Sequence, residues 1–130
     1  GIVREPLAGV EANCPVGRET RMWLISPRAM IGNFVAGYEA PSSALPAWHS
    51  VNVPGISVTV AEMVDALRRV AGDAVADRVT FRHDPVVDRI VRTWPRDFDA
   101  KVGRSLGMRA DPDFASIVRQ YVEHDMPKAR

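Results

Sequence analysis

The chain contains few residues that could perform catalysis by themselves. Its three histidines, His49, His83 and His124, are far apart, and none has another His, Cys or carboxylate at metal-ligand spacing. His83 precedes Asp84, but an aspartate before a proline is typical of a helix cap. The single cysteine, Cys14, has no histidine or Cys-x-x-C partner nearby, so we expect it to be buried and inert. We therefore predict no metal site and no catalytic residue in this chain.

The sequence also lacks the glycine pattern of a nucleotide-binding loop. Such a loop places closely spaced glycines between a strand and a helix, where backbone N–H groups can approach phosphate. Gly32 and Gly37 lie inside a predicted helix, and neither is followed by the Lys-Ser/Thr pair of a P-loop. Neither Tyr38 nor Tyr121 has a lysine four residues later. We expect both tyrosines to be core or interface aromatics, and no cofactor-binding residue is predicted.

Composition excludes several classes of partner. The 130 residues are 46% hydrophobic and 25% charged, which suits one globular domain or a portion of one. Seventeen basic and sixteen acidic residues are interspersed and give a net charge of +1, which disfavours nucleic acid. No apolar run approaches the roughly 20 residues that span a bilayer. With one cysteine and no disulfide, the chain is predicted to be cytoplasmic.

Start signals predict where the helices lie. The clearest helix begins near Thr59, because Thr59 and Glu62 form a capping box, and it ends at Gly72. Its apolar residues recur at helical spacing: Val60, Met63, Val64, Leu67 and Val70. Three more helices are predicted where a capping residue precedes proline, at Ser26-Pro27, Asp84-Pro85 and Asp111-Pro112. A short helix is predicted between Asp99 and Gly107.

Two of these helices have a clear apolar face. The first carries Met30, Phe34, Val35 and Tyr38 and ends before Pro41. The last carries Phe114, Ile117, Val118 and Tyr121 and ends by Pro127.

Strands are short and alternate with the helices. They are predicted at 22–25, 50–53 and 78–82. This order favours a helix-rich α/β fold with a few short strands and about five helices. Three short strands do not complete a doubly wound sheet, so we expect the sheet to be completed outside this chain.

Several stretches resemble the extended short-chain dehydrogenases/reductases, the NAD-dependent epimerase/dehydratase family. They are Ile-Val-Arg-Glu-Pro-Leu-Ala-Gly at 2–9, Arg-Met-Trp-Leu-Ile-Ser-Pro-Arg-Ala at 21–29 and Val-Asn-Val-Pro-Gly-Ile-Ser-Val-Thr-Val-Ala-Glu-Met at 51–63. Trp94-Pro95, Phe98-Asp99-Ala100 and Leu106-Gly107 extend the resemblance along nearly the whole chain. Within the family, sugar-acid dehydrogenases are the most similar group.

The resemblance implies that residues 1–130 are the C-terminal, substrate-facing portion of a Rossmann-type enzyme. The N-terminal dinucleotide-binding portion would then be absent, and with it the glycine-rich loop, the catalytic tyrosine and its lysine. NAD would be bound mainly by that portion and would exchange hydride with a hydroxyl-bearing carbon. The chain alone is expected to be inactive. The family also implies a homo-oligomer, and a separated fragment is expected to self-associate through uncovered apolar faces.

The same resemblance implies four substrate-binding residues. Arg21 matches the arginine of the family's Arg-Asp-Phe-Val-His-Val-x-Asp-Val stretch, which commonly contacts the substrate phosphate, and Trp23 matches its aromatic residue. Met22 and Arg28 replace the two aspartates, which favours a smaller anionic substrate held by a bidentate guanidinium.

Arg4 and Trp94 complete this set. By resemblance, Arg4 borders the substrate cleft as a second anion contact, although a surface arginine paired with Glu5 is the alternative. Trp23 and Trp94 line the cleft or are partly buried core residues.

Three functions remain open at this point. The first is a substrate-binding fragment of an NAD-dependent oxidoreductase acting on a sugar acid such as D-erythronate. The second is a fragment of a nucleotide-sugar epimerase or dehydratase, and the third is a standalone binding or interaction module.

Overall fold

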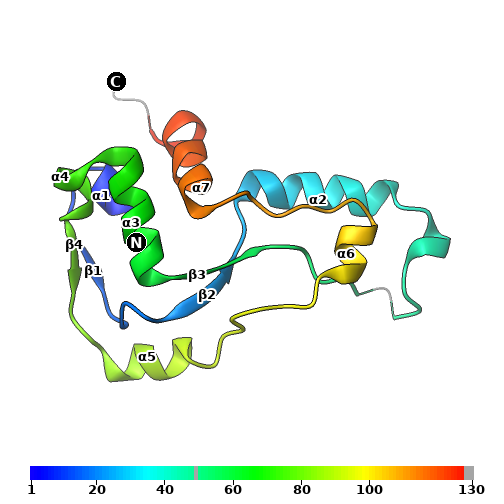
Figure 1. The fold of residues 1–130 in the computed structure, drawn as a ribbon, viewed down its shortest axis with the longest axis horizontal. Helices are drawn as coiled ribbons and strands as arrows, with labels where there is room; N and C mark the ends of the chain where they lie inside the picture. The colour runs from blue at the N-terminus through cyan, green and yellow to red at the C-terminus, as the bar shows by residue number, and fades with distance from the viewer. Residues whose placement is uncertain (49, 128–130) are drawn as a thin grey trace.

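A computed structural model describes residues 1–48 and 50–127 (Figure 1). Over these residues the helices are α1 (Arg4–Leu7), α2 (Pro27–Glu39), α3 (Val60–Ala71), α4 (Asp73–Ala76), α5 (Pro85–Val91), α6 (Lys101–Ser105) and α7 (Phe114–Gln120). The strands are β1 (Ala12–Cys14), β2 (Arg21–Leu24), β3 (Ile56–Thr59) and β4 (Val79–Phe81). A 3-10 turn at Ser42–Ala44 and a π-helical turn at Tyr121–Asp125 complete the elements. The predicted helix-rich α/β class is confirmed. The helices outnumber the five expected because α1 and α4 are single turns.

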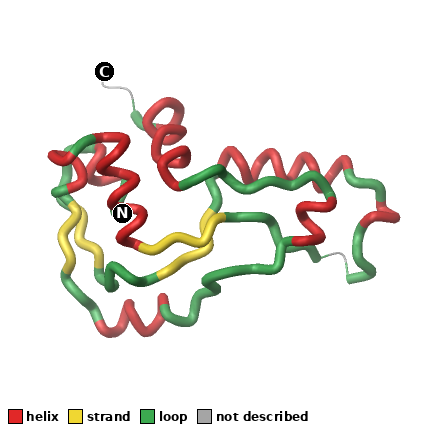
Figure 2. Tube along the Cα trace, viewed as in Figure 1, coloured by secondary structure: helices red, strands yellow, loops and turns green. Residues whose placement is uncertain are grey.

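The strands form two separate pairs (Figure 2). β1 pairs with β4 in parallel, with Ala12 opposite Val79. β2 pairs with β3 in the antiparallel sense, with Arg21 opposite Thr59 and Leu24 opposite Ile56. The strands expected at 22–25 and 78–82 are confirmed to within a residue or two, whereas β1 was not predicted.

The strand predicted at 50–53 is wrong. The partner of β2 begins only at Ile56, after Pro54, which has no N–H to donate to a ladder. The preceding segment packs against α6 instead. A Cβ atom added to Gly103 of α6 would lie 2.5 Å from the carbonyl oxygen of Asn52. The Asn52 side-chain amide also donates to the Asp99 carbonyl oxygen at 3.1 Å.

The core forms around α3, whose predicted bounds are confirmed. The Thr59 hydroxyl accepts from the Glu62 N–H at 3.1 Å, and the Glu62 carboxylate accepts from the Thr59 N–H at 2.6 Å. The helix ends at Gly72, whose φ is +87°. Its buried residues are Val60, Met63, Val64, Ala66 and Leu67, and they pack against Phe114, Ala115 and Val118 of α7.

Among the other predicted caps, two are wrong. Asp84 caps α5 as predicted. The cap of α6 was predicted to be Asp99, but the N-cap residue is Ala100, although the Asp99 carboxylate accepts from the Lys101 N–H. α7 is capped by Asp113, which accepts from the Ser116 N–H at 2.6 Å, and not by Asp111. The carboxylate of Asp111 is buried and already accepts hydrogen bonds from a residue 85 positions away, Ser26.

Helix α2 extends away from the packed pair of α3 and α7 (Figure 1). It begins after Ser26, whose hydroxyl accepts from the Ala29 N–H, and it ends before Pro41 as predicted. Its predicted apolar face exists, but Phe34, Val35 and Tyr38 are exposed. No helix among the described residues is long and apolar enough to cross a membrane.

Candidate functional site

The candidate site lies between the β2–β3 ribbon and the segment 91–98. Alternation along β2 places Arg21 and Trp23 on one face of the ribbon. The Ser57 hydroxyl of β3 donates to the Arg96 carbonyl oxygen at 2.6 Å and so ties the segment to the ribbon. Two neighbouring hollows line this contact.

Arg21 is held in place by β3 and α3. Its Nη1 donates to the Ser57 carbonyl oxygen at 2.9 Å, and its Nη2 lies 3.6 Å from the Glu62 Oε2 atom. The pKa of Glu62 is held below its ordinary value, first by the Thr59 backbone N–H and hydroxyl and then by the charge of Arg21. A guanidinium has five N–H donors, so Arg21 keeps donors for a further anion.

The first hollow has a cationic wall. It has a volume of about 160 Å³ and is lined by Glu19, Thr20, Arg21, Val91, Arg92 and Arg96. Arg92 donates through Nε to Asp88 Oδ2 at 2.7 Å, and this hydrogen bond is the main cause that lowers the pKa of Asp88. Arg92 and Arg96 were missed by the sequence reasoning. The available signal was that they flank Trp94-Pro95 closely in the chain.

The second hollow is aromatic. It has a volume of about 220 Å³ and is lined by Met22, Trp23, Leu24, Trp94, Pro95 and Phe98. The rings of Trp23 and Phe98 meet edge to face with centroids 5.9 Å apart. Trp94 is 51% exposed, so it forms an open wall and not part of the core. The structure therefore brings Trp23 and Trp94 together in one hollow, while Arg21 lines the other.

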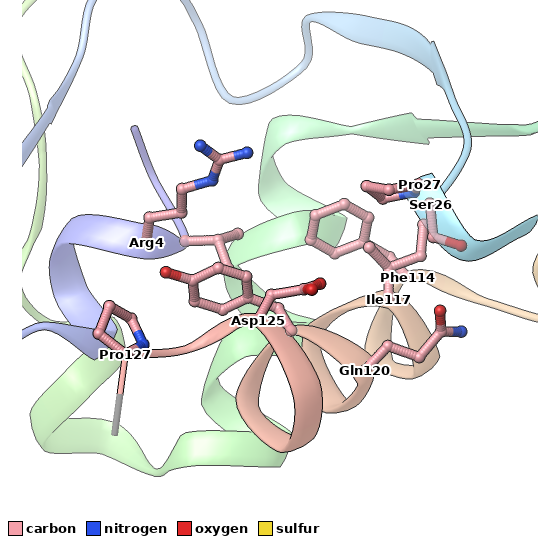
Figure 3. Close-up of a pocket in the computed structure, with 10 residues that line it drawn as sticks. Arg4, Ser26, Pro27, Phe114, Ile117, Gln120, Asp125 and Pro127 are labelled. Carbon is pink, nitrogen blue, oxygen red and sulfur yellow. The ribbon is translucent and has the colours of Figure 1, made fainter. Parts of the chain in front are cut away.

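Arg4 lies in a different pocket, shown in Figure 3. This pocket has a volume of about 500 Å³ and is lined by Val3, Arg4, Ser26, Pro27, Phe114, Ile117, Gln120, Tyr121, Asp125 and Pro127. The Arg4 guanidinium carbon is 6.0 Å from the centre of the Tyr121 ring. The carboxylate of Glu5, the alternative partner of Arg4, lies 4.0 Å from the amine of Gly1.

The histidines and the cysteine have structural surroundings. His83 Nε2 lies 3.4 Å from Asp88 Oδ2, while Asp84 caps α5. His124 lies 3.3 Å from Arg28, and His49 lies outside the described residues. Cys14 is buried as predicted. Within residues 1–48 and 50–127, no three His, Cys, Asp or Glu side chains are grouped to hold a metal ion.

Comparison with known proteins gives close relatives but no matching family model. The chain is 50% identical over 123 residues to a D-erythronate dehydrogenase of Cupriavidus necator, a match that covers 95% of this chain and 38% of that protein. It is 40% identical over 125 residues to a D-erythronate dehydrogenase of Haemophilus influenzae, covering 96% of this chain and 40% of that protein. The chain thus spans about two fifths of the length of these relatives.

Solved structures share the fold. A protein described as the nucleoside-diphosphate-sugar epimerase from Agrobacterium tumefaciens superposes with a TM-score of 0.91 at 33% identity, over 95% of this chain and 36% of that one. The L-threonine 3-dehydrogenase of Trypanosoma brucei superposes with a TM-score of 0.78 at 20% identity, over 98% of this chain and 40% of that one. The predicted resemblance to sugar-acid dehydrogenases and epimerase-like Rossmann enzymes is confirmed, over a portion of those proteins.

Proposed function

We propose that this chain is the substrate-binding portion of an NAD-dependent oxidoreductase that acts on a sugar acid, with D-erythronate as the first candidate. The observation that carries this proposal is the 50% identity along 123 residues to a D-erythronate dehydrogenase. In this proposal, residues 1–130 correspond to the C-terminal portion, and a separate N-terminal portion binds the dinucleotide. The intact enzyme is a cytoplasmic homo-oligomer.

The two hollows suit the two ends of such a substrate. A sugar acid carries one carboxylate, which the guanidinium of Arg21 would bind as a fork, with the charges of Arg92 and Arg96 beside it. Trp23 and Trp94 would enclose the carbon chain in the adjacent aromatic hollow. The carboxylate of Glu62 orients Arg21 and disfavours a second anion on that side.

NAD, when bound, would accept the hydride from a hydroxyl-bearing carbon. The residues that bind NAD, and the tyrosine and lysine that move the proton, are proposed to lie outside this chain. The residues within it bind and orient the substrate and exclude water. Arg4, in its separate pocket, is proposed as a second anion contact, and the chain by itself is expected to be inactive.

The test is a chimera in which this chain replaces the matching 123 residues of the Cupriavidus necator enzyme. With NAD and D-erythronate, we expect NADH to form, as measured by absorbance. Arg21→Lys removes the fork and is expected to raise KM about tenfold or more, which is the scale of one charged hydrogen bond. Arg69→Lys, on the exposed side of α3, is the control and should leave KM unchanged. A folded chimera that forms no NADH would contradict the dehydrogenase.

A second candidate is a nucleotide-sugar epimerase or dehydratase. The TM-score of 0.91 with the Agrobacterium tumefaciens protein of that description favours it. Such an enzyme keeps the hydride within one substrate, so turnover of a nucleotide sugar without NADH accumulation would support it. A standalone binding module would instead require a coding region without a glycine-rich loop and a Tyr-x-x-x-Lys motif.

A further inference from the structure

Helix α2 carries an apolar stripe on its outer side. The stripe consists of Ile31, Phe34, Val35 and Tyr38, which are 63%, 66%, 50% and 90% exposed. Their spacing places all four side chains within about 100° around the helix axis. Single exposed apolar residues are ordinary, but a contiguous stripe with two aromatic rings marks an interaction surface.

The side of α2 that faces the rest of this chain is fixed by hydrogen bonds. Asn33 lies about 160° from Ile31 around the helix. Its amide Nδ2 donates to the Arg109 carbonyl oxygen at 2.9 Å, and its Oδ1 accepts from the Arg109 N–H at 2.8 Å. At the start of the helix, Ser26 donates twice to Asp111. Hydrogen bonds therefore attach α2 to its own chain, and Phe34, Val35 and Tyr38 of the stripe stay exposed.

We propose that this stripe is the surface on which the dinucleotide-binding portion of the enzyme docks. The inference rests on the proposed function. The matched region is 38% and 40% of the two D-erythronate dehydrogenases, so in each of them the larger part of the polypeptide lies outside this region and is available to cover it. None of the four stripe residues is charged, so the occupant is an apolar helix or sheet face of that portion.

The area of the stripe favours this occupant over a second copy of the chain. Four side chains of these types offer roughly 500 Å². A stable complex of two proteins buries about 800 Å² on each partner, and it must also offset the loss of translational and rotational freedom. A portion of the same polypeptide has no such association cost. The self-association expected for the isolated chain would therefore be weak if it relied on this stripe alone.

Thiol labelling tests the proposal directly. Cys14 is buried, so Tyr38→Cys introduces one accessible thiol at a position that is 90% exposed. At micromolar concentration, maleimide should modify this thiol about tenfold or more slowly in the full-length chimera, with its other cysteines replaced by serine, than in the isolated chain. Asp65→Cys, on the exposed side of α3, is the control and should react equally fast in both proteins. Phe34→Cys should behave as Tyr38→Cys does.

Two outcomes overturn the proposal. One is equal labelling of Tyr38→Cys in the chimera and in the isolated chain. The other is slow labelling in the isolated chain that becomes fast on dilution, because a second copy would then cover the stripe. NADH formation is measured separately. If the chimera forms NADH but Tyr38→Cys is labelled as fast as in the isolated chain, only the docking proposal is refuted. If Tyr38→Cys is protected from maleimide but no NADH forms, only the dehydrogenase proposal is refuted.

Discussion

Replacing Asp111 with alanine should strongly destabilise the chain. Asp111 is 5% exposed and accepts from the Ser26 N–H and hydroxyl, each at 2.7 Å, and from the Gln120 side-chain amide at 3.2 Å. Ser26 is 1% exposed, so water cannot replace the lost acceptor. A buried donor left without a partner costs about 1–3 kcal/mol, so two such donors predict a loss of about 2–6 kcal/mol.

Urea denaturation followed by circular dichroism measures this loss. With a typical dependence of about 1.5 kcal/mol per molar urea, the midpoint should fall by about 1–4 M. Such a loss is a large part of the total stability of a domain, about 5–15 kcal/mol, so Asp111→Asn provides a milder second variant. It keeps one acceptor oxygen, and we expect about half the effect.

Asp113→Ala is the matched control. The same change two residues later removes only the exposed cap of α7, which should cost about 1 kcal/mol. If Asp111→Ala lowered the free energy of unfolding no more than Asp113→Ala does, the buried carboxylate would not be the link between α2 and α7, and the reasoning would be refuted.

Four further changes probe local features. Thr59→Ala removes the capping box and should lower the free energy of unfolding by about 1 kcal/mol in the same urea assay. Arg92 and then His83 hold the pKa of Asp88 below its ordinary value, so the unfolded chain takes up this proton first, near pH 3.9. Stability should therefore fall below about pH 4, and Asp88→Asn should flatten this fall in urea titrations between pH 3 and 6. In Gly55→Ala, the new Cβ would lie 2.6 Å from Trp23 Nε1, so tryptophan fluorescence should shift and stability should drop by about 1–3 kcal/mol. Gly32→Ala, with no neighbour within 4 Å, should gain about 1 kcal/mol.

Signals contained within a few residues predicted the local structure well. The capping box at Thr59 and Glu62 needs only one helical turn, and it correctly marked the start of α3. Ser26 and Asp84 before prolines correctly marked α2 and α5 for the same reason. Each of these caps satisfies backbone groups of its own segment, so the sequence alone contains the full interaction.

Features that depend on distant partners were missed. Asp111 and Asp113 are equally good caps on paper, and the choice is decided by Ser26, which uses the carboxylate of Asp111. Likewise, residues 50–53 have strand-like composition, but the antiparallel register pairs β2 with residues after Pro54. Neither the hydrogen bond nor the register is visible from local spacing.

The candidate site shows the same division. Trp23 and Trp94 were named from the resemblance, and the fold brings them together in one hollow, where the Ser57–Arg96 hydrogen bond ties the segment 91–98 to the ribbon. The resemblance was less informative about Arg4, which faces a separate pocket. Arg92 and Arg96 join the cationic wall only because the segment 91–98 folds back on β2.

An apolar pattern on a helix indicates burial, but it does not indicate what covers it. In α3 the apolar residues are buried by α7, a partner within the same chain. α2 also carries an apolar stripe, yet Asn33 faces the chain and Tyr38 faces outward. One side of α2 is held to this chain by hydrogen bonds, and the other side is an exposed apolar stripe. A helix of this kind suits a boundary between two folded portions. In the docking proposal, hydrogen bonds fix α2 to this chain, and the apolar stripe is left for the proposed dinucleotide-binding portion.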